Sequence, residues 1–172
     1  MTGSAAHPDP VMDAITAAIA AGGAGDGEGA RVALLAIWDD IGASGDALHR
    51  CTLAHYLADL YDDPAVALTW DVRALDAADA LTEERAQQHH ASLHVAGFYP
   101  SLHLNLADNY RRLGSFAAAR DHIAAARQVL PALPPGPYGD LIRQAVGDVS
   151  EAITQRVTAR RATAPGPAAR GG

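Results

Sequence analysis

Apolar residues recur every three or four positions through most of the chain, with polar residues between them. This spacing places the apolar side chains on one face of an α-helix, whereas a strand needs alternating apolar and polar residues. No segment of the sequence shows that alternation, so the pattern predicts an all-α protein. The expected helices span residues 10–22, 28–41, 46–61, 64–80, 98–113, 116–130 and 138–158, and residues 82–97 are expected to form a short helix followed by a turn.

Glycine, proline and aspartate separate these helices at regular points. Residues 22–29 and 42–45 are rich in glycine, residues 113–115 predict a helix end, and residues 131–137 form a proline-rich linker. Residues 62–64, Asp-Asp-Pro, combine a tight turn with negative charge and a proline at the start of the next helix. The helices between these breaks are long enough to pack in pairs as helical hairpins.

One domain is expected over residues 10–160, since a chain of 172 residues supports a single core more readily than two. Residues 1–9 and 161–172 are expected to be disordered tails, because they offer little to bury. Residues 82–97 interrupt the spacing of the hairpins and are expected to be an insertion.

The hairpin over residues 98–130 carries an ordered series of small and bulky positions. The series is Leu106, Ala107, Tyr110, Gly114, Phe116, Ala119, Ile123, Ala126 and Pro131. It resembles a tetratricopeptide repeat, in which small residues stand where two helices touch and bulky residues fill the gaps between hairpins. The chain departs from that repeat at three positions: His103 replaces the usual Trp, Ala107 stands where Gly is frequent, and Ile123 replaces an aromatic residue.

Two weaker copies of the series precede this hairpin. Residues 25–37 parallel residues 114–126, and residues 57–61 parallel residues 106–110. Their small and bulky positions are Ala30, Leu34, Ala67 and Ala74. An alternative alignment of the repeat also stays open, in which its landmark positions are Trp38, Gly42, Ala47 and Ala54.

The resemblance implies about three hairpins, over residues 10–41, 46–80 and 98–130, stacked in a short right-handed solenoid. The helix over residues 138–158 would then cap the exposed end. In such proteins the first helix of each hairpin lines a concave groove that binds a protein, a peptide or a small charged ligand.

Polar residues at helical spacing mark the face expected to line this groove. They are Thr52, His55, Asp59, Ser101, Asn105, Asp108 and Arg112. Asn105 and Arg112 resemble the groove residues with which the family holds peptide backbone or carboxylate groups. A solvated helix face would show the same pattern without any ligand.

The composition of the chain limits the classes of partner and of chemistry that are expected. The net charge is −7, and no basic cluster precedes Arg156, Arg160 and Arg161, so nucleic acid is not expected as a partner. No stretch approaches the roughly 20 apolar residues of a membrane span. The chain has no lysine, which excludes Schiff-base and P-loop lysines. A single cysteine, Cys51, excludes internal disulfides and fits a reducing compartment, so a cytoplasmic location is expected.

Histidine suggests an alternative function. Six of the eight histidines lie between residues 49 and 103, and His90 and His94 are four apart, a spacing that can chelate a transition metal on a helix. His55 or His103 from the groove helices, with Asp59 as a carboxylate, would complete a site for Zn, Fe, Cu or Ni.

Two hypotheses follow from the sequence. The first is a binding scaffold without cofactor or catalysis, whose partner is another protein, a peptide or a second copy of the chain. The second is a metal-dependent enzyme or metal-binding protein that uses His55, His90, His94 and His103. Cys51 and His55, also four apart, are interpreted as a core residue and a groove residue rather than a reactive pair.

Overall fold

The computed structural model describes residues 8–90 and 93–162, and all regular structure in these ranges is helical. The helices are α1 (Pro10–Gly23), α2 (Gly27–Ile41), α3 (Ala47–Asp59), α4 (Pro64–Asp79), α5 (Glu83–His89), α6 (Tyr99–Arg112), α7 (Phe116–Val129) and α8 (Pro137–Thr154), with 3₁₀ turns η1 (Val95–Gly97) and η2 (Leu130–Ala132). The all-α prediction is confirmed. No helix of the described residues is long and apolar enough to cross a membrane.

Acidic and hydroxyl side chains start most of the helices. Asp9, Asp26, Asp46 and Asp63 each accept a backbone N–H bond at the start of α1, α2, α3 and α4, and Thr82 does so for α5. Such caps satisfy N–H groups that have no partner inside the helix. The expectation that Asp62-Asp63-Pro64 opens a helix is confirmed, with Asp63 as the cap.

The last helix ends four residues earlier than predicted. The Val157 amide donates to the Ala152 carbonyl and the Arg156 amide to the Ile153 carbonyl, while Arg156 has a left-handed φ of 54°. This arrangement closes a helix end by satisfying its last carbonyl groups. The apolar face of α8 finishes at Ile153, so continuing the helix would bury nothing more.

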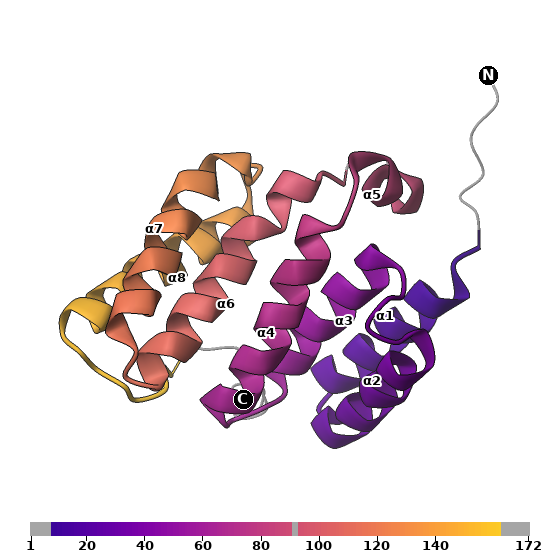
Figure 1. The fold of residues 1–172 in the computed structure, drawn as a ribbon, viewed down its shortest axis with the longest axis horizontal. Helices are drawn as coiled ribbons and strands as arrows, with labels where there is room; N and C mark the ends of the chain where they lie inside the picture. The colour runs from indigo at the N-terminus through magenta and orange to yellow at the C-terminus, as the bar shows by residue number, and fades with distance from the viewer. Residues whose placement is uncertain (1–7, 91–92, 163–172) are drawn as a thin grey trace.

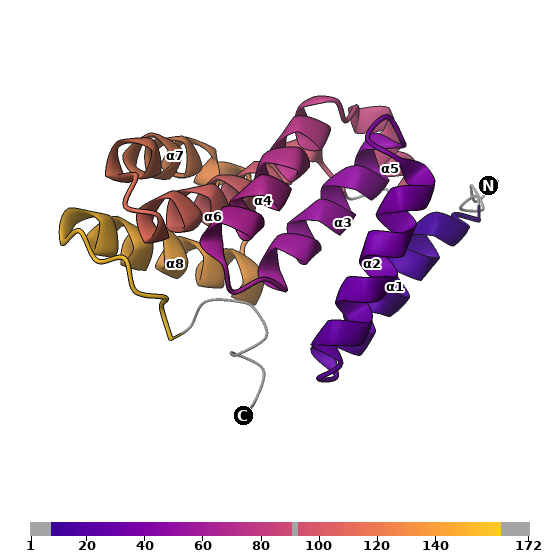
Figure 2. The same ribbon diagram turned by 60° about the horizontal axis from the view of Figure 1, so that its bottom comes forward.

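Consecutive helices pack as pairs: α1 with α2, α3 with α4, and α6 with α7. The pairs follow one another along the long axis of the molecule, from α1 and α2 at one end to α7 and α8 at the other (Figure 1). The pairs are joined by contacts of α3 with α1 and α2 and of α4 with α6. Helix α8 packs on α6 and α7 at the C-terminal end (Figure 2).

Two hydrophobic clusters hold the stack together. The N-terminal cluster is built by α1 to α5 with Leu102, and the C-terminal cluster by α6, α7 and α8. Helix α6 belongs to both, since Leu102 lies in the first and Leu104 in the second. The small positions of the repeat series, Ala107, Ala119 and Ala126, have no exposed surface. Because these side chains are small, the backbones of neighbouring helices can approach each other closely.

A pair of tryptophans connects the first two hairpins. Trp38 of α2 and Trp70 of α4 meet edge to face, with ring centroids 5.1 Å apart. The guanidinium of Arg73 lies over both rings, at 5.4 Å from Trp38 and 4.4 Å from Trp70. Aromatic and cation–π contacts of this kind add to the burial of the rings themselves.

Candidate functional site

A large hollow of the described structure is a groove of about 1160 Å³. It is lined by α3, α6, α8 and the segment around η2, and α8 packs directly on α6. Residues 93–98, which end the insertion, line it as well. We call this hollow the groove. Its volume exceeds the roughly 300–1,000 Å³ of ordinary small-molecule pockets, so it can hold a longer ligand.

Five of the seven predicted groove residues line this hollow: Thr52, His55, Asp59, Ser101 and Asn105. Thr52, His55 and Asp59 come from α3, and Ser101 and Asn105 from α6. The Ser101 hydroxyl is buried and donates to the Phe98 carbonyl. It therefore stabilises the start of α6, and its proton is not available to a ligand. Asn105 donates to Asp59 at 3.3 Å and thereby connects the two helices.

The other two predicted residues, Asp108 and Arg112, do not line the groove. Both lie in a smaller hollow next to it, which also contains Asp59 and Asn105. Asp108 is buried and accepts two bonds from Arg111, at 3.0 and 2.7 Å. Arg112 donates to the Asp62 carbonyl at 2.5 Å. Their polar groups are therefore bound to the protein itself.

A buried carboxylate stands behind the α3 and α6 wall. Asp71 of α4 has no exposed surface. Asn109 donates to its Oδ2 at 2.7 Å, Asn105 approaches its Oδ1 at 3.5 Å, and the Nδ1 of His55 forms an ion pair with it at 3.6 Å. Burying a charge is costly unless it is paired, and these groups supply the pairing. The network joins α3, α4 and α6 beneath the groove.

The two titrating groups of this network affect each other. Burial raises the pKa of Asp71 to about 6, although His55 and Asn105 oppose the increase. Burial alone would lower the pKa of His55, but the carboxylates of Asp71 and Asp59 raise it above its ordinary value. A histidine on the groove wall that is backed by a carboxylate can hold or transfer a proton near neutral pH.

The segment after α8 closes one end of the groove. Arg111 of α6 is fully buried and donates to the carbonyls of Val157 and Ala159, at 2.5 and 2.9 Å. Arg161 then reaches Asp108 at 3.4 Å and lines the groove. Arg161 belongs to the range predicted to be a tail, and this contact corrects that boundary. Residues 163–172 lie outside the described residues.

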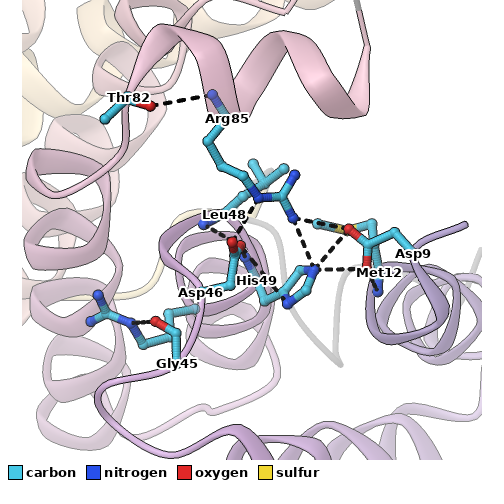
Figure 3. A network of polar contacts seen from close by, with 9 residues as sticks. Asp9, Met12, Gly45, Asp46, Leu48, His49, Thr82 and Arg85 are labelled. Atoms are coloured by element: carbon cyan, nitrogen blue, oxygen red, sulfur yellow. Dashed lines mark hydrogen bonds and ion pairs between the residues drawn. The ribbon is translucent and has the colours of Figure 1, made fainter. Parts of the chain in front are cut away.

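A second polar network joins the starts of α1, α3 and α5 (Figure 3). Arg85 donates to Asp46 at 2.6 Å and to Asp9 at 2.9 Å, and the Nε2 of His49 lies 2.8 Å from Asp9. Burial would raise the pKa of Asp9, but bonds from His49, the Met12 amide and Arg85 lower it to about 2. Asp9 therefore belongs to the folded body and not to the predicted tail. Residues 1–7 lie outside the described residues.

The histidines of the metal hypothesis occupy different parts of the molecule. His55 and His94 line the groove, His103 lies outside it, and His94 is exposed and pairs with Glu83 at 3.4 Å. Helix α5 ends at His89, and His90 has an extended backbone, so His90 and His94 do not share a helix face. Within residues 8–90 and 93–162, no three His, Cys, Asp or Glu side chains are placed to hold a metal ion.

One histidine of the metal hypothesis, His103, does meet another histidine, His122. The Nδ1 atoms of His103 on α6 and His122 on α7 are 3.0 Å apart. Tyr99 stacks on His103 and Tyr110 on His122, with interplanar angles of 25° and 10°. Burial lowers the pKa of both histidines, and His122 lowers that of His103 further, so the neutral form is favoured.

Cys51 is a core residue, as the sequence analysis expects. Its side chain is buried in the N-terminal cluster, and burial raises the pKa of its thiol to about 12. A thiol with so high a pKa is almost entirely protonated at neutral pH and is a poor nucleophile.

The sequence analysis missed Asp71, Arg111 and His122. Asp71 does carry a signal, because it stands four residues after Ala67 and three before Ala74 and so shares the buried face of its helix. Arg111 carries the same kind of signal, because it stands four residues after the buried Ala107. His122 carries none, since its partner His103 comes from another helix. Comparison of the chain with protein-family profiles, curated proteins and solved structures found no match.

Proposed function

We propose that the protein is a tetratricopeptide-like scaffold, a short right-handed solenoid of three hairpins capped by α8, that binds a peptide segment of a partner protein in the groove. One observation carries this proposal: an open groove larger than ordinary small-molecule sites, lined by polar side chains of α3 and α6 and by exposed apolar side chains of α8. The buried small positions of the repeat series support the scaffold assignment.

The lining of the groove favours a peptide with apolar side chains. Tyr138 and Leu141 of α8 line the groove and are 55% and 61% exposed, which is unusual for side chains of this size. Thr52 and Asn105 offer groups that can bond to peptide backbone. Asp59 and Asp148 add negative charge, so a basic side chain in the peptide would be complementary.

A displayed library of random 12-residue peptides, selected on the full chain, tests the proposal. We expect enriched peptides to combine apolar residues with Arg or Lys and to bind in the micromolar range, because a short groove buries little surface. The dissociation constant of a selected peptide is then measured by fluorescence anisotropy. Leu141→Ser should weaken binding about tenfold, since an apolar contact is lost without disturbing the core.

The matched control is Val32→Ser. Val32 is 57% exposed on α2, at the other end of the molecule, and its replacement should leave peptide affinity unchanged. Asp148→Asn should weaken only peptides with a basic residue, and the exposed Asp39→Asn should not. Peptides that bind wild type and Leu141→Ser equally, or a library that yields no enriched sequence, would count against the groove as the binding site.

A further inference from the structure

We propose that His103 and His122 together chelate a divalent transition-metal ion, Cu²⁺ or Zn²⁺, through their Nδ1 atoms. This site is separate from the groove. His103 lies two residues from both Ser101 and Asn105, which line the groove, so it points to the opposite side of α6. Neither histidine lines the groove, and the proposal does not depend on the peptide-binding function.

The distance between the two nitrogens matches chelation. Copper and zinc bind imidazole nitrogen at about 2.0–2.1 Å, which places two such nitrogens about 2.9 Å apart at a right angle and about 3.3 Å apart at the tetrahedral angle. The observed Nδ1–Nδ1 distance is 3.0 Å. The ring centroids are 5.3 Å apart, so the two rings lie end to end and their Nδ1 lone pairs point at each other. Both rings must therefore turn by roughly 20–45° before one ion can reach both nitrogens.

The surroundings hold the two rings next to each other. Tyr99, His103, His122 and Tyr110 form a continuous row of contacting rings across α6 and α7. The Tyr99 hydroxyl is fixed in turn by a 2.8 Å bond to Asp79. Ligands that already lie next to each other lose less freedom when a metal binds, which favours affinity.

The protons balance without any redox change. In the metal-free pair one Nδ1–H donates to the lone pair of the other Nδ1, so one histidine is the Nδ1–H tautomer and the other the Nε2–H tautomer. Metal binding needs both Nδ1 lone pairs. The donor ring gives up its Nδ1 proton and takes one at Nε2, so both rings stay neutral and no net proton is released. Water occupies the remaining positions of the ion.

Imidazole ligands and the Irving–Williams order predict that Cu²⁺ binds most tightly and Zn²⁺ less tightly. The test is a Cu²⁺ titration of the full chain without an affinity tag, at pH 7.5 in a non-chelating buffer, followed by calorimetry and electron paramagnetic resonance. We expect one tight Cu²⁺ per chain with nitrogen ligands. His103→Gln and His122→Gln should each weaken binding at least tenfold.

The matched control is the double variant His90→Gln/His94→Gln, which removes the pair that sequence spacing favoured and should leave the Cu²⁺ affinity unchanged. Loss of tight binding in this control alone, or equal affinity in wild type and His122→Gln, would overturn the proposal. Nitrogen NMR of the wild type with Zn²⁺ gives a test without any variant. It should show both His103 and His122 in the Nε2–H form, so that the ring that donates in the metal-free pair changes its tautomer; unchanged tautomers would also overturn the proposal.

Discussion

At the scale of single residues, the ionisation of Asp71 should oppose folding. Its pKa of about 6 lies above the ordinary value of 3.8, so the folded protein holds this proton more tightly than the unfolded chain. The stabilising effect of the proton is complete below pH 4 and is lost as the pH rises through 6. A shift of this size corresponds to about 3 kcal/mol at most.

Asp71→Asn should remove this dependence. We expect the free energy of unfolding of the variant to increase relative to that of wild type by about 1–3 kcal/mol between pH 4.5 and 7.5, which means that the variant gains stability. Loss of the Asp71 charge also lets burial lower the pKa of His55, which acts in the same direction. Urea unfolding at both pH values measures the effect, and the exposed Asp39→Asn is the control. A difference that stays constant with pH would contradict the assignment.

The residues that the sequence did not reveal share one property. Asp71, Arg111 and His122 each have at least one partner that lies 19 or more positions away along the chain. Helical spacing relates only residues within a few turns of each other. It therefore placed Thr52, His55 and Asp59 on one face correctly, but it could not show that His103 would meet His122 rather than His90 or His94.

At the scale of elements, the sequence predicted the helices well because local rules decide them. Aspartate caps, prolines at first turns and glycine breaks act within four residues, so the start of each major helix was predicted within one residue. The end of α8 was missed because Arg111 binds the carbonyls of Val157 and Ala159. That contact depends on α6, which no local pattern describes.

The Arg85 network joins three helices at their starts, and its removal should loosen the N-terminal hairpin. Arg85→Met should lower the free energy of unfolding at pH 7 by about 1–3 kcal/mol, since charge-assisted bonds to Asp9 and Asp46 are lost. The pKa values of both aspartates are lowered. Their contribution is therefore present above pH 4 and is lost as the pH falls towards 2.

Urea unfolding at pH 7 and pH 2.5 measures this prediction. The difference between wild type and Arg85→Met should shrink at the lower pH, because the aspartates of the unfolded chain are protonated there and folding then gains less from their ionised form. Arg120→Met is the matched control, as Arg120 is an exposed arginine of α7. Equal destabilisation by the two variants would show that loss of charge, and not the network, is responsible.

At the scale of the whole molecule, the two hydrophobic clusters predict unequal local stability. Val149 of α8 is fully buried in the C-terminal cluster, and Val149→Ala should cost about 2 kcal/mol through lost burial and a cavity. Stacked helical units unfold partly independently. We expect amide hydrogen exchange to accelerate mainly in α7 and α8, with α1 and α2 much less affected.

The reciprocal variant is Leu34→Ala, which removes most of a buried side chain from the N-terminal cluster. It should accelerate exchange in α1 and α2 while α7 and α8 keep most of their protection. Equal acceleration throughout the chain in both variants would instead indicate one cooperative unit.

The order of the helices along the stack could be predicted from the repeat series. That α8 lines the groove could not be predicted from it. The sequence analysis treated α8 only as a cap. In the structure Tyr138 and Leu141 of α8 line the groove together with residues of α3 and α6. Their exposure is visible only after α8 has packed on α6 and α7, because in the sequence they look like ordinary apolar positions of an amphipathic helix.

The tryptophan pair determines what optical spectroscopy can detect in this protein. Trp38 and Trp70 are the only two tryptophans of the chain, and both belong to the N-terminal cluster. Intrinsic fluorescence, and any exciton signal from rings 5.1 Å apart, will report the docking of the first two hairpins. Melting of α7 and α8 would leave both signals nearly unchanged. A fluorescence titration taken alone would then describe half of the molecule as if it were the whole.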